Sequence, residues 1–242
     1  MNADRRPTGT VGLAGARQAL AAGTAVVLPN PAPLTCVVAG TDPAAVNGAK
    51  HRPADQPVAL WAHHPDTFAD VADALDLDRT ALARARHLLT EELLTLLVPL
   101  RPAARRPAWL APASKDGWTL LFGARWQPLR PLLDAFPVLY VSSANRTGHP
   151  PAADTAEAVA VFGADTAVLA VAEPPESAVP ESSTREAAAA GGPAVEPSAR
   201  RRATTTLRLH SDGRLTLHRH GAQDHPYPDA AAYLAHLRGI SG

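Results

Sequence analysis

The residues best suited to chemistry follow an apolar run near the middle of the chain. Val138-Leu139-Tyr140-Val141 reads as a buried strand, and it gives way to Ser142-Ser143-Ala144-Asn145 and a turn marked by Gly148 and Pro150. In open α/β sheets, ligands bind in the crevice beyond the strand ends. Hydroxyl and amide groups there can hydrogen-bond phosphate, ribose or a base edge. The alternative is a polar turn in which Asn145 satisfies local backbone groups.

A second candidate is the basic tetrapeptide Lys50-His51-Arg52-Pro53. In an extended segment, Lys50 and Arg52 project to the same side and could both bind one polyanion. Arginine offers a planar fork for phosphate oxygens, and lysine offers a compact point charge. The alternative is a solvated basic loop.

Four further residues are polar or cationic at the ends of expected strands. Arg125 follows the apolar run Leu120-Leu121-Phe122, and a cation there can face either an anionic ligand or an acidic neighbour. Thr204 and Thr205 could be ordinary strand residues. Arg219, before His220-Gly221, could likewise face either an anionic ligand or an acidic neighbour.

Several other kinds of site find little support. His63-His64 and His218-x-His220 lack the partner ligands of a zinc site, so we expect no metal centre. Cys36 lies in an apolar run, where a small core residue is more common than a nucleophile. The sequence holds no P-loop, dinucleotide glycine fingerprint or nucleophile elbow. We therefore expect no side-chain nucleophile, and a bound ATP would need another arrangement.

The elements that must position these residues alternate between strand and helix. Gly23, Asp66, Asp78 and the Asp154/Glu157 pair supply helix-end signals, and Ser211-Asp212-Gly213 predicts a hairpin. This order indicates a twisted mixed α/β sheet with flanking helices. The expected strands cover residues 24–28, 35–39, 57–61, 93–98, 118–122, 137–142, 166–171, 204–209 and 214–219, and the expected helices cover 13–22, 66–75, 78–89, 154–163 and 229–238.

One segment, residues 173–202, is rich in Pro, Ala, Glu, Ser and Gly and has no periodicity, so we expect a disordered insert. The whole chain of 242 residues fits one α/β domain with an appended segment.

Net charge and cysteine content limit the classes of partner and the location that we expect. Lys+Arg and Asp+Glu number 23 each, so no global basic field drives binding to nucleic acid or a membrane. A single cysteine suits a reducing cytoplasm. The sequence has neither a secretory leader nor an apolar run of the roughly 20 residues that span a bilayer. We therefore expect a cytoplasmic protein with no membrane partner.

Taken together in chain order, these segments resemble the YrdC family of threonylcarbamoyl-adenylate synthases and their relatives. The similarity is colinear over roughly residues 10–225, and its parts are specific only in combination. The matching segments are Gly23-Thr24-Ala25-Val26-Val27-Leu28-Pro29, Lys50-His51-Arg52-Pro53, Leu94-Thr95-Leu96, Gly123-Ala124-Arg125 with Pro128, Ser143-Ala144-Asn145 with Gly148, Thr204-Thr205 and Arg219-His220-Gly221.

The resemblance implies a fold and a reaction. It implies one YrdC-like domain over residues 11–225 around a large, positively lined cavity, after a flexible segment 1–10 and before a C-terminal helix and tail at 226–242. Bicarbonate, L-threonine and ATP with Mg²⁺ would give threonylcarbamoyl-adenylate and pyrophosphate, for later modification of a tRNA adenosine. The implied nucleotide-binding residues are Lys50 and Arg52 on the triphosphate, Ser143, Asn145, Thr204 and Thr205 on the nucleotide, and Arg125 and Arg219 as further cavity charge.

One segment departs from the family pattern. The family's first strand continues as Pro-Thr-Asp/Glu-Thr-x-Tyr-Gly-Leu and lines the amino-acid pocket, whereas this chain has Pro29-Asn30-Pro31-Ala32-Pro33-Leu34-Thr35-Cys36. The family's threonines, tyrosine and glycine are replaced there. A pocket built to hydrogen-bond a substrate hydroxyl discriminates strongly for that substrate. We therefore expect the amino-acid pocket to differ from that of the family, with Asn30, Ala32 and Leu34 as its residues.

Three functions stay open at this point. The first is a carbamoyl-adenylate synthase that uses L-threonine or another amino acid, with possible tRNA or tRNA-modification partners. The second is a non-catalytic module that binds nucleotide or double-stranded RNA, against which the neutral net charge argues. The third is a degenerate relative with no surviving ligand.

Overall fold

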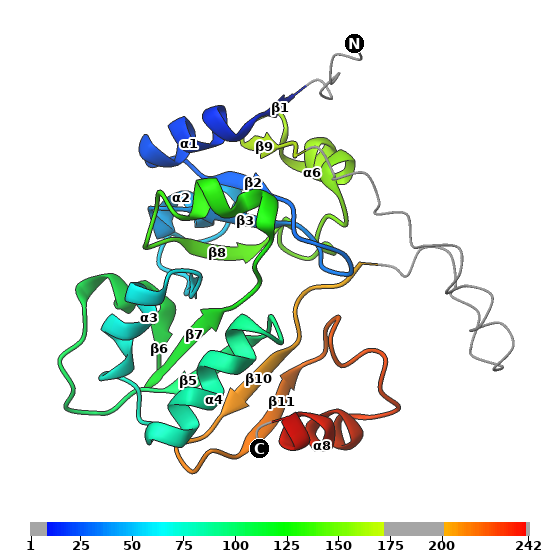
Figure 1. Cartoon of the computed structure of the whole chain (residues 1–242). Coiled ribbons are helices and arrows are strands. Elements are labelled where there is room, and N and C mark those ends of the chain that lie inside the picture. Colours follow the sequence, from blue (N-terminus) through cyan, green and yellow to red (C-terminus); the bar gives the residue numbers. More distant parts are fainter. Residues whose placement is uncertain (1–8, 172–200, 241–242) are drawn as a thin grey trace, which may run out of the picture.

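The structure is a computed structural model, and it describes residues 9–171 and 201–240. Helices and strands alternate over much of the chain (Figure 1). The strands are β1 (Thr10–Val11), β2 (Val26–Leu28), β3 (Val37–Gly40), β4 (Ala59–Trp61), β5 (Thr95–Pro99), β6 (Ser114–Lys115), β7 (Trp118–Phe122), β8 (Tyr140–Ser143), β9 (Ala167–Leu169), β10 (Thr206–Leu209) and β11 (Leu215–Arg219). The helices are α1 (Leu13–Ala21), α2 (Pro43–Ala49), α3 (Pro65–Ala72), α4 (Arg79–Thr90), α5 (Arg130–Leu133), α6 (Thr155–Phe162) and α8 (Ala230–Ile240), with short 3₁₀ helices at Ala108–Ala113 and Gln127–Leu129.

All these strands join one sheet in the order β1-β9-β2-β3-β8-β4-β7-β5-β10-β11, and β6 pairs with β7 outside this path. The sheet contains both parallel pairs, such as β4 with β7, and antiparallel pairs, such as β3 with β8. The sheet is therefore mixed, and the predicted fold class is confirmed. The twist brings α4 and α8 to one end of the molecule, beside β5, β10 and β11 (Figure 1).

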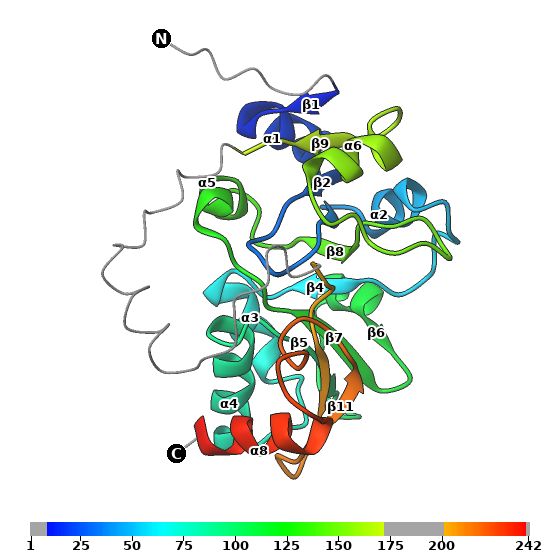
Figure 2. The same cartoon turned by 90° about the vertical axis from the view of Figure 1, so that its right-hand side faces the viewer.

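Alternating side chains send the strands' apolar residues into two cores. Val27 of β2 packs in one core, while its neighbours Val26 and Leu28 pack in the other, because successive side chains point to opposite faces of a sheet. Helices α1 and α5 supply the second core, and α2, α3, α4, α6 and α8 supply the first. Figure 2 shows α5 and α6 on opposite sides of the strands. Burial on both faces explains the uninterrupted apolar runs of the central strands.

Some local predictions are confirmed and others need correction. Asp78 caps α4 by accepting from Ala81 N, and Asp154 caps α6 by accepting from Glu157 N, as expected. The residues flanking Ser211-Asp212-Gly213 form the β10–β11 hairpin. Asp66, however, is not the cap of α3, because the His64 imidazole accepts the Asp66 N–H and Pro65 is the first helical residue.

Helix α2 was not predicted, although it carries a start signal. Asp42 accepts the Ala44 N–H, and Pro43 follows at the first helical position, a pair typical of helix starts. Its seven residues include Asn47 and Gly48, both poor helix formers, so the apolar periodicity is too short to detect.

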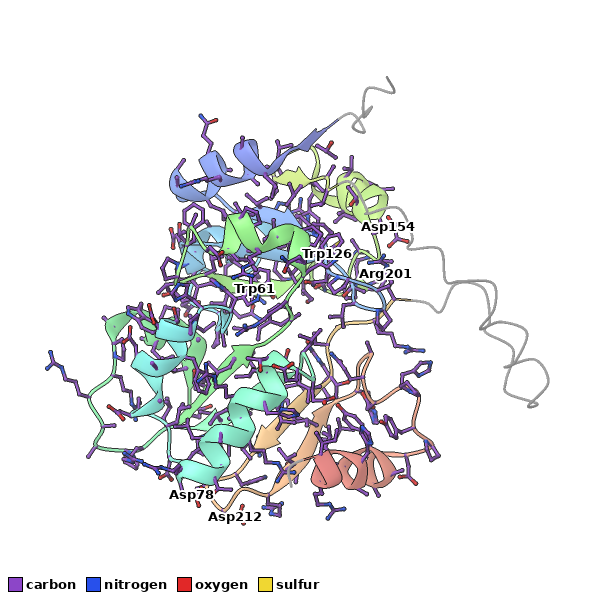
Figure 3. The ribbon with its side chains drawn as sticks, in the orientation of Figure 1. Trp61, Asp78, Trp126, Asp154, Arg201 and Asp212 are labelled. Atoms are coloured by element: carbon purple, nitrogen blue, oxygen red, sulfur yellow. The ribbon has the colours of Figure 1, made fainter. Side chains whose placement is uncertain are left out.

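Most of the predicted insert, residues 173–200, lies outside the described residues, as do residues 1–8, 172 and 241–242. Its last two residues are described and are well paired. Arg202 N donates to Pro33 O and Arg202 O accepts from Thr35 N, while Arg201 Nη1 donates to Asn30 O at 2.9 Å. The predicted disorder is therefore wrong for Arg201 and Arg202, which hold the loop before β3. Figure 3 labels Arg201 where the described chain resumes.

Candidate functional site

A pocket of about 220 Å³ opens beside the middle strands of the sheet. We call it the cationic pocket, because Arg52 and Arg219 line it and none of its lining residues is an aspartate or glutamate among the part of the chain that the structure describes. Its floor comes from β3, β4, β7 and β8, and its rim from the loop before β3, the chain after α2 and the approach to β10. The lining residues are Asn30, Thr35, Val37, Arg52, Pro57, Val58, Ala59, Thr95, Leu120, Phe122, Val141, Ser142, Ser143, Ala203, Thr204 and Arg219.

Arg52 presents unfilled hydrogen-bond donors to this pocket. Its Nε donates to Asn47 Oδ1 at 2.6 Å, which fixes the guanidinium plane. Its Nη2 is buried and has no partner among the described residues. Burial lowers the pKa of this guanidinium, yet arginine stays charged in proteins. A buried cation with an unfilled donor is costly unless a ligand completes it, so Arg52 fits an anion.

Arg219 adds a second positive charge at the rim. It is exposed, and its Nη2 lies 3.5 Å from Thr204 O, a long and weak contact. Thr204 itself lines the pocket, with Oγ1 2.6 Å from Thr95 Oγ1. Two cations and several hydroxyls with no facing carboxylate form an environment that favours phosphate or carboxylate.

Lys50 has a different role from the one expected. It ends α2, and His51 has a φ of 53°, so the segment turns instead of running extended. The Lys50 ammonium is buried, donates to Ser143 O, and contacts Asn145 O at 2.8 Å and Asn145 Oδ1 at 2.7 Å. The idea that Lys50 and Arg52 project to one side is therefore wrong, and Lys50 does not line the pocket.

Asn145 is held in the same network. Its Oδ1 accepts from Ser143 Oγ at 2.7 Å, and its Nδ2 donates to Arg146 O and His149 O. Burial, followed by the Arg52 charge, lowers the pKa of Lys50 to about 7. We call Lys50, Ser143 and Asn145 the loop lock, because together they fix the segment after β8. Ser143 alone of the three also lines the cationic pocket.

Thr205 belongs to another internal network. Its side chain is fully buried, and Oγ1 donates to Asp224 Oδ1 at 2.6 Å while accepting from Gln223 N and Asp224 N. Asp224, which the sequence did not single out, also accepts from Gly221 N. A Cβ at Gly221 would lie 2.2 Å from Thr205 N, so only glycine fits this close approach.

Of the three residues expected for an amino-acid pocket, one lines the cationic pocket and two do not. Asn30 lines the cationic pocket; its Nδ2 donates to Thr35 O at 2.8 Å, and its buried Oδ1 has no partner among the described residues. Leu34 packs in the core, and Ala32 is exposed; neither lines the pocket.

Arg125 lies in a separate pocket of about 510 Å³, beyond the ends of β4 and β7. We call this the strand-end pocket. Arg125 was expected to add charge to the same cavity as Arg52, but it does not line the cationic pocket, and its Nη2 donates to Ala62 O, directly after β4. The single large cavity implied by the resemblance remains a prediction, since the charges divide between these two pockets.

The fold has known counterparts. The Sua5/YciO/YrdC family model, described as telomere recombination, matches residues 18–186. The chain belongs to this family, as the residues quoted above predicted. No protein with a curated description matches it. In the described residues, no helix is long and apolar enough to cross a membrane.

Solved structures agree in fold at low sequence identity. P. abyssi Sua5 complexed with L-threonine matches with a TM-score of 0.58 at 16% identity, covering 86% of this chain and 54% of that one. E. coli YciO matches with a TM-score of 0.57 at 10% identity, covering 87% and 89%. Full-length HypF in a phosphate- and nucleotide-bound form gives 0.57 at 13%, covering 90% and 30%. The chain thus spans about half the length of the P. abyssi protein (54%).

Proposed function

We propose that the chain is an ATP-dependent nucleotidyltransferase that makes a carbamoyl-adenylate from bicarbonate, an amino acid and ATP. The amine condenses with bicarbonate to give a carbamate and water. A carbamate oxygen then attacks the α-phosphorus of ATP, the bond to the β-phosphate oxygen breaks, and pyrophosphate leaves. This reaction needs alignment and charge neutralisation and no side-chain nucleophile.

The observation that carries the proposal is the unfilled Nη2 donor of Arg52 in a pocket without a lining carboxylate. In the proposed complex, Arg52 and Arg219 bind the triphosphate, and their charges stabilise the negative charge that builds up as pyrophosphate leaves. Thr204 offers a hydroxyl to the same phosphates, and Ser143 can do so once its Oγ–H turns from Asn145 Oδ1 to the ligand. Mg²⁺ comes with ATP as part of the substrate and neutralises phosphate charge there.

The pocket's size supports partial enclosure of the nucleotide. A volume of about 220 Å³ is below the roughly 300–1,000 Å³ typical of pockets that enclose a whole small ligand. The phosphates and the amino acid would then lie inside, with the base and ribose at the open side. The unfilled Oδ1 of Asn30 is an acceptor for the substrate's N–H or O–H.

The matching loop of the family is altered here, so the amino acid is left to experiment. The test is pyrophosphate release from ATP and bicarbonate with L-threonine and a panel of other amino acids, using the full chain. Release that depends on one amino acid supports the proposal and identifies the substrate. ATP binding without release for any amino acid would instead support a non-catalytic nucleotide-binding module.

A cytoplasmic location and transfer of the product to tRNA complete the proposal. Neutral net charge argues against strong binding of RNA by the chain alone, since that affinity grows with the number of phosphates neutralised. Release of free carbamoyl-adenylate, with no requirement for added tRNA, is therefore the expected behaviour.

A further inference from the structure

Arg146 has no role in the proposed reaction so far, yet it links three segments of the chain. It follows Asn145 directly, and its Nη1 donates to Ala49 O at 2.7 Å, at the end of α2. Its Nη2 donates to both carboxylate oxygens of Asp165, at 3.2 and 2.9 Å, shortly after α6. The guanidinium also lies over the Phe162 ring, 5.1 Å from the ring centroid. Arg146 therefore joins the ends of two helices to the loop after β8.

These contacts fix the guanidinium more firmly than a single surface ion pair would. The Arg146 side chain is only 20% exposed. Its hydrogen bonds lower the pKa of the Asp165 carboxyl, which is therefore ionised at neutral pH. Thr166 Oγ1 donates to the same carboxylate at 3.1 Å, and His51 Nε2 lies 3.6 Å from it. An isolated exposed pair contributes little, whereas a network of this kind holds one geometry.

Arg146 does not itself face a bound ligand, because it lines neither the cationic pocket nor the strand-end pocket. Phe162, which it covers, packs in the first core. Figure 2 shows α2 and α6 on the same side of the strands, away from α5. Val37 and Ala59 line the cationic pocket and pack in the second core, on the opposite face of the sheet. Any effect of Arg146 on a bound anion must therefore pass through other residues.

The first step of that route is the end of α2. Arg146 donates from the loop after β8 to Ala49 O. Lys50, the next residue, donates in the opposite direction, to Asn145 O at 2.8 Å and Asn145 Oδ1 at 2.7 Å. The two segments thus hold each other by side chains from both sides. Loss of Arg146 would leave only the Lys50 half of this link.

The second step leads from α2 to Arg52. The Arg52 backbone N–H donates to Asn47 O at 3.2 Å, and its Nε donates to Asn47 Oδ1 at 2.6 Å. Asn47 is fully buried in α2, and its Nδ2 donates to Ala54 O and Gln56 O. A shift at the end of α2 would therefore move the Arg52 guanidinium, which lines the cationic pocket. Displacements of about 1 Å in a catalytic site can lower rates by about 100-fold.

We propose that Arg146 is a positioning residue for Arg52, and that it acts through the end of α2. The inference rests on the proposed function for its ligand, ATP, whereas the contacts that carry it depend on no reaction. Arg146 binds no substrate and moves no proton. Its planar fork suits this role because it reaches a backbone carbonyl and a carboxylate at the same time.

The first measurement follows Lys50, which reports the link between the two segments without any ligand. The chain has two lysines, so ¹³C-labelled lysine gives one side-chain signal from Lys50 and one from Lys115 in NMR spectra of the full chain. The Lys50 signal should titrate near pH 7, because burial and the Arg52 charge lower its pKa to about 7. In Arg146→Gln the ammonium gains water, and the midpoint should rise by about one pH unit or more. The signal of the exposed Lys115 should be the same in both proteins.

A second variant separates positioning from the direct effect of charge. Loss of a nearby positive charge would by itself raise the pKa of Lys50. Asp165→Ala removes a negative charge instead, which by itself would lower that pKa. Release of Arg146 from its carboxylate should still raise the Lys50 midpoint. Because the Asp165 side chain is 47% exposed, this variant remains informative if Arg146→Gln misfolds.

The second measurement is the dissociation constant for ATP, from calorimetry of the full chain. Arg146→Gln should raise it about tenfold, which corresponds to about 1.4 kcal/mol. The matched control is Arg214→Gln, which breaks another arginine–aspartate pair, 3.8 Å from Arg214 Nε to Asp212 Oδ2, and lines neither pocket. It should change neither the ATP affinity nor the Lys50 signal. Urea unfolding shows that each variant is folded.

The positioning role is overturned if the Lys50 midpoint is unchanged in Arg146→Gln or falls in Asp165→Ala. It is also overturned if the wild type binds ATP and Arg146→Gln binds it equally well, or if Arg214→Gln weakens binding as much. A wild type that binds no ATP would contradict the proposed function, and the positioning role with it. The wild-type measurement therefore distinguishes the two failures.

Discussion

Lys50 and Arg52 are two residues apart in the chain and carry the same charge, yet the structure uses them in opposite ways. Lys50 is 3% exposed, and its ammonium has three oxygen acceptors, one in the last residue of β8 and two in Asn145 after it. The Arg52 guanidinium lines the cationic pocket and keeps a buried donor without a partner. A cation whose donors are filled by the protein holds the fold, and one whose donors are unfilled is available to a ligand. The comparison assigns stability to the loop lock and binding to the cationic pocket.

The sharpest test of this division is Arg52→Gln, for which we expect the largest effect. Glutamine keeps a polar side chain but removes the charge that would face the triphosphate. Loss of one preorganised donor to a developing negative charge typically lowers rates by about 10²–10³. We expect pyrophosphate release to fall by about 100-fold or more, with the free energy of unfolding changed by less than about 1 kcal/mol.

The matched control for this experiment is Arg105→Gln, which removes an exposed arginine outside both pockets. It should retain the wild-type rate. Full activity of Arg52→Gln would contradict the assignment of binding to the cationic pocket, because the unfilled donor would then play no part in the reaction.

The second effect concerns the loop lock. Lys50→Met keeps the length and apolar stem of the side chain and removes the donors to Ser143 and Asn145. Hydrogen bonds to charged groups contribute about 1.5–3 kcal/mol, so we expect a loss of that size in the free energy of unfolding, measured with urea below pH 7, where the Lys50 amine is protonated. Lys115→Met, at the chain's other lysine, is exposed and should change it by less than about 0.5 kcal/mol. Equal stability of the two variants would contradict the loop lock.

A third effect follows from the pKa of Lys50, which burial and Arg52 lower to about 7 from 10.5. Between these values the folded protein has lost the proton that the unfolded chain still binds. Stability attributable to Lys50 should therefore rise as the pH is raised from 7 to 10.5 and stay level below 7. The slope cannot exceed about 1.4 kcal/mol per pH unit.

Urea unfolding of the wild type and of Lys50→Met over this pH range isolates the contribution, because the other titrating groups are common to both proteins. The difference between the two stabilities should grow with pH. A difference that stays constant would mean that Lys50 titrates alike in the folded and unfolded states.

The fold could be predicted because its signals are local and redundant. The apolar run 138–141 and the Asp78 cap each identify an element on their own, and colinear motifs identify the family. Helix α2 was missed because it is short and contains Asn47 and Gly48. The family match and the solved structures agree with the mixed sheet even at 10–16% identity.

The site was less predictable, because its division depends on side-chain direction. His51 has a positive φ, so the chain turns between Lys50, which contacts Asn145, and Arg52, which lines the cationic pocket. No residue type in Lys50-His51-Arg52-Pro53 announces that turn. Arg125 follows β7 on the side where that strand and β4 end, so it lines a different pocket from Arg219, although both match family motifs. Asp224, which orients Thr205, could not be found from the sequence, because it lies far from Thr205 along the chain.

The smallest expected effect tests whether the amino acid lies on the Asn30 side of the cationic pocket. Asn30→Leu removes the unfilled Oδ1 acceptor and also the 2.8 Å bond from Nδ2 to Thr35 O. If Oδ1 accepts a hydrogen bond from the amino acid, its loss should raise the KM for that substrate about tenfold, equivalent to about 1.4 kcal/mol. The KM for ATP should change by less than about twofold, because the phosphates face Arg52 and Arg219. A loop that merely loosens would raise both KM values together. Arg201, which donates to Asn30 O and Leu34 O, holds the loop through backbone atoms that the substitution leaves in place, so the two outcomes can be told apart.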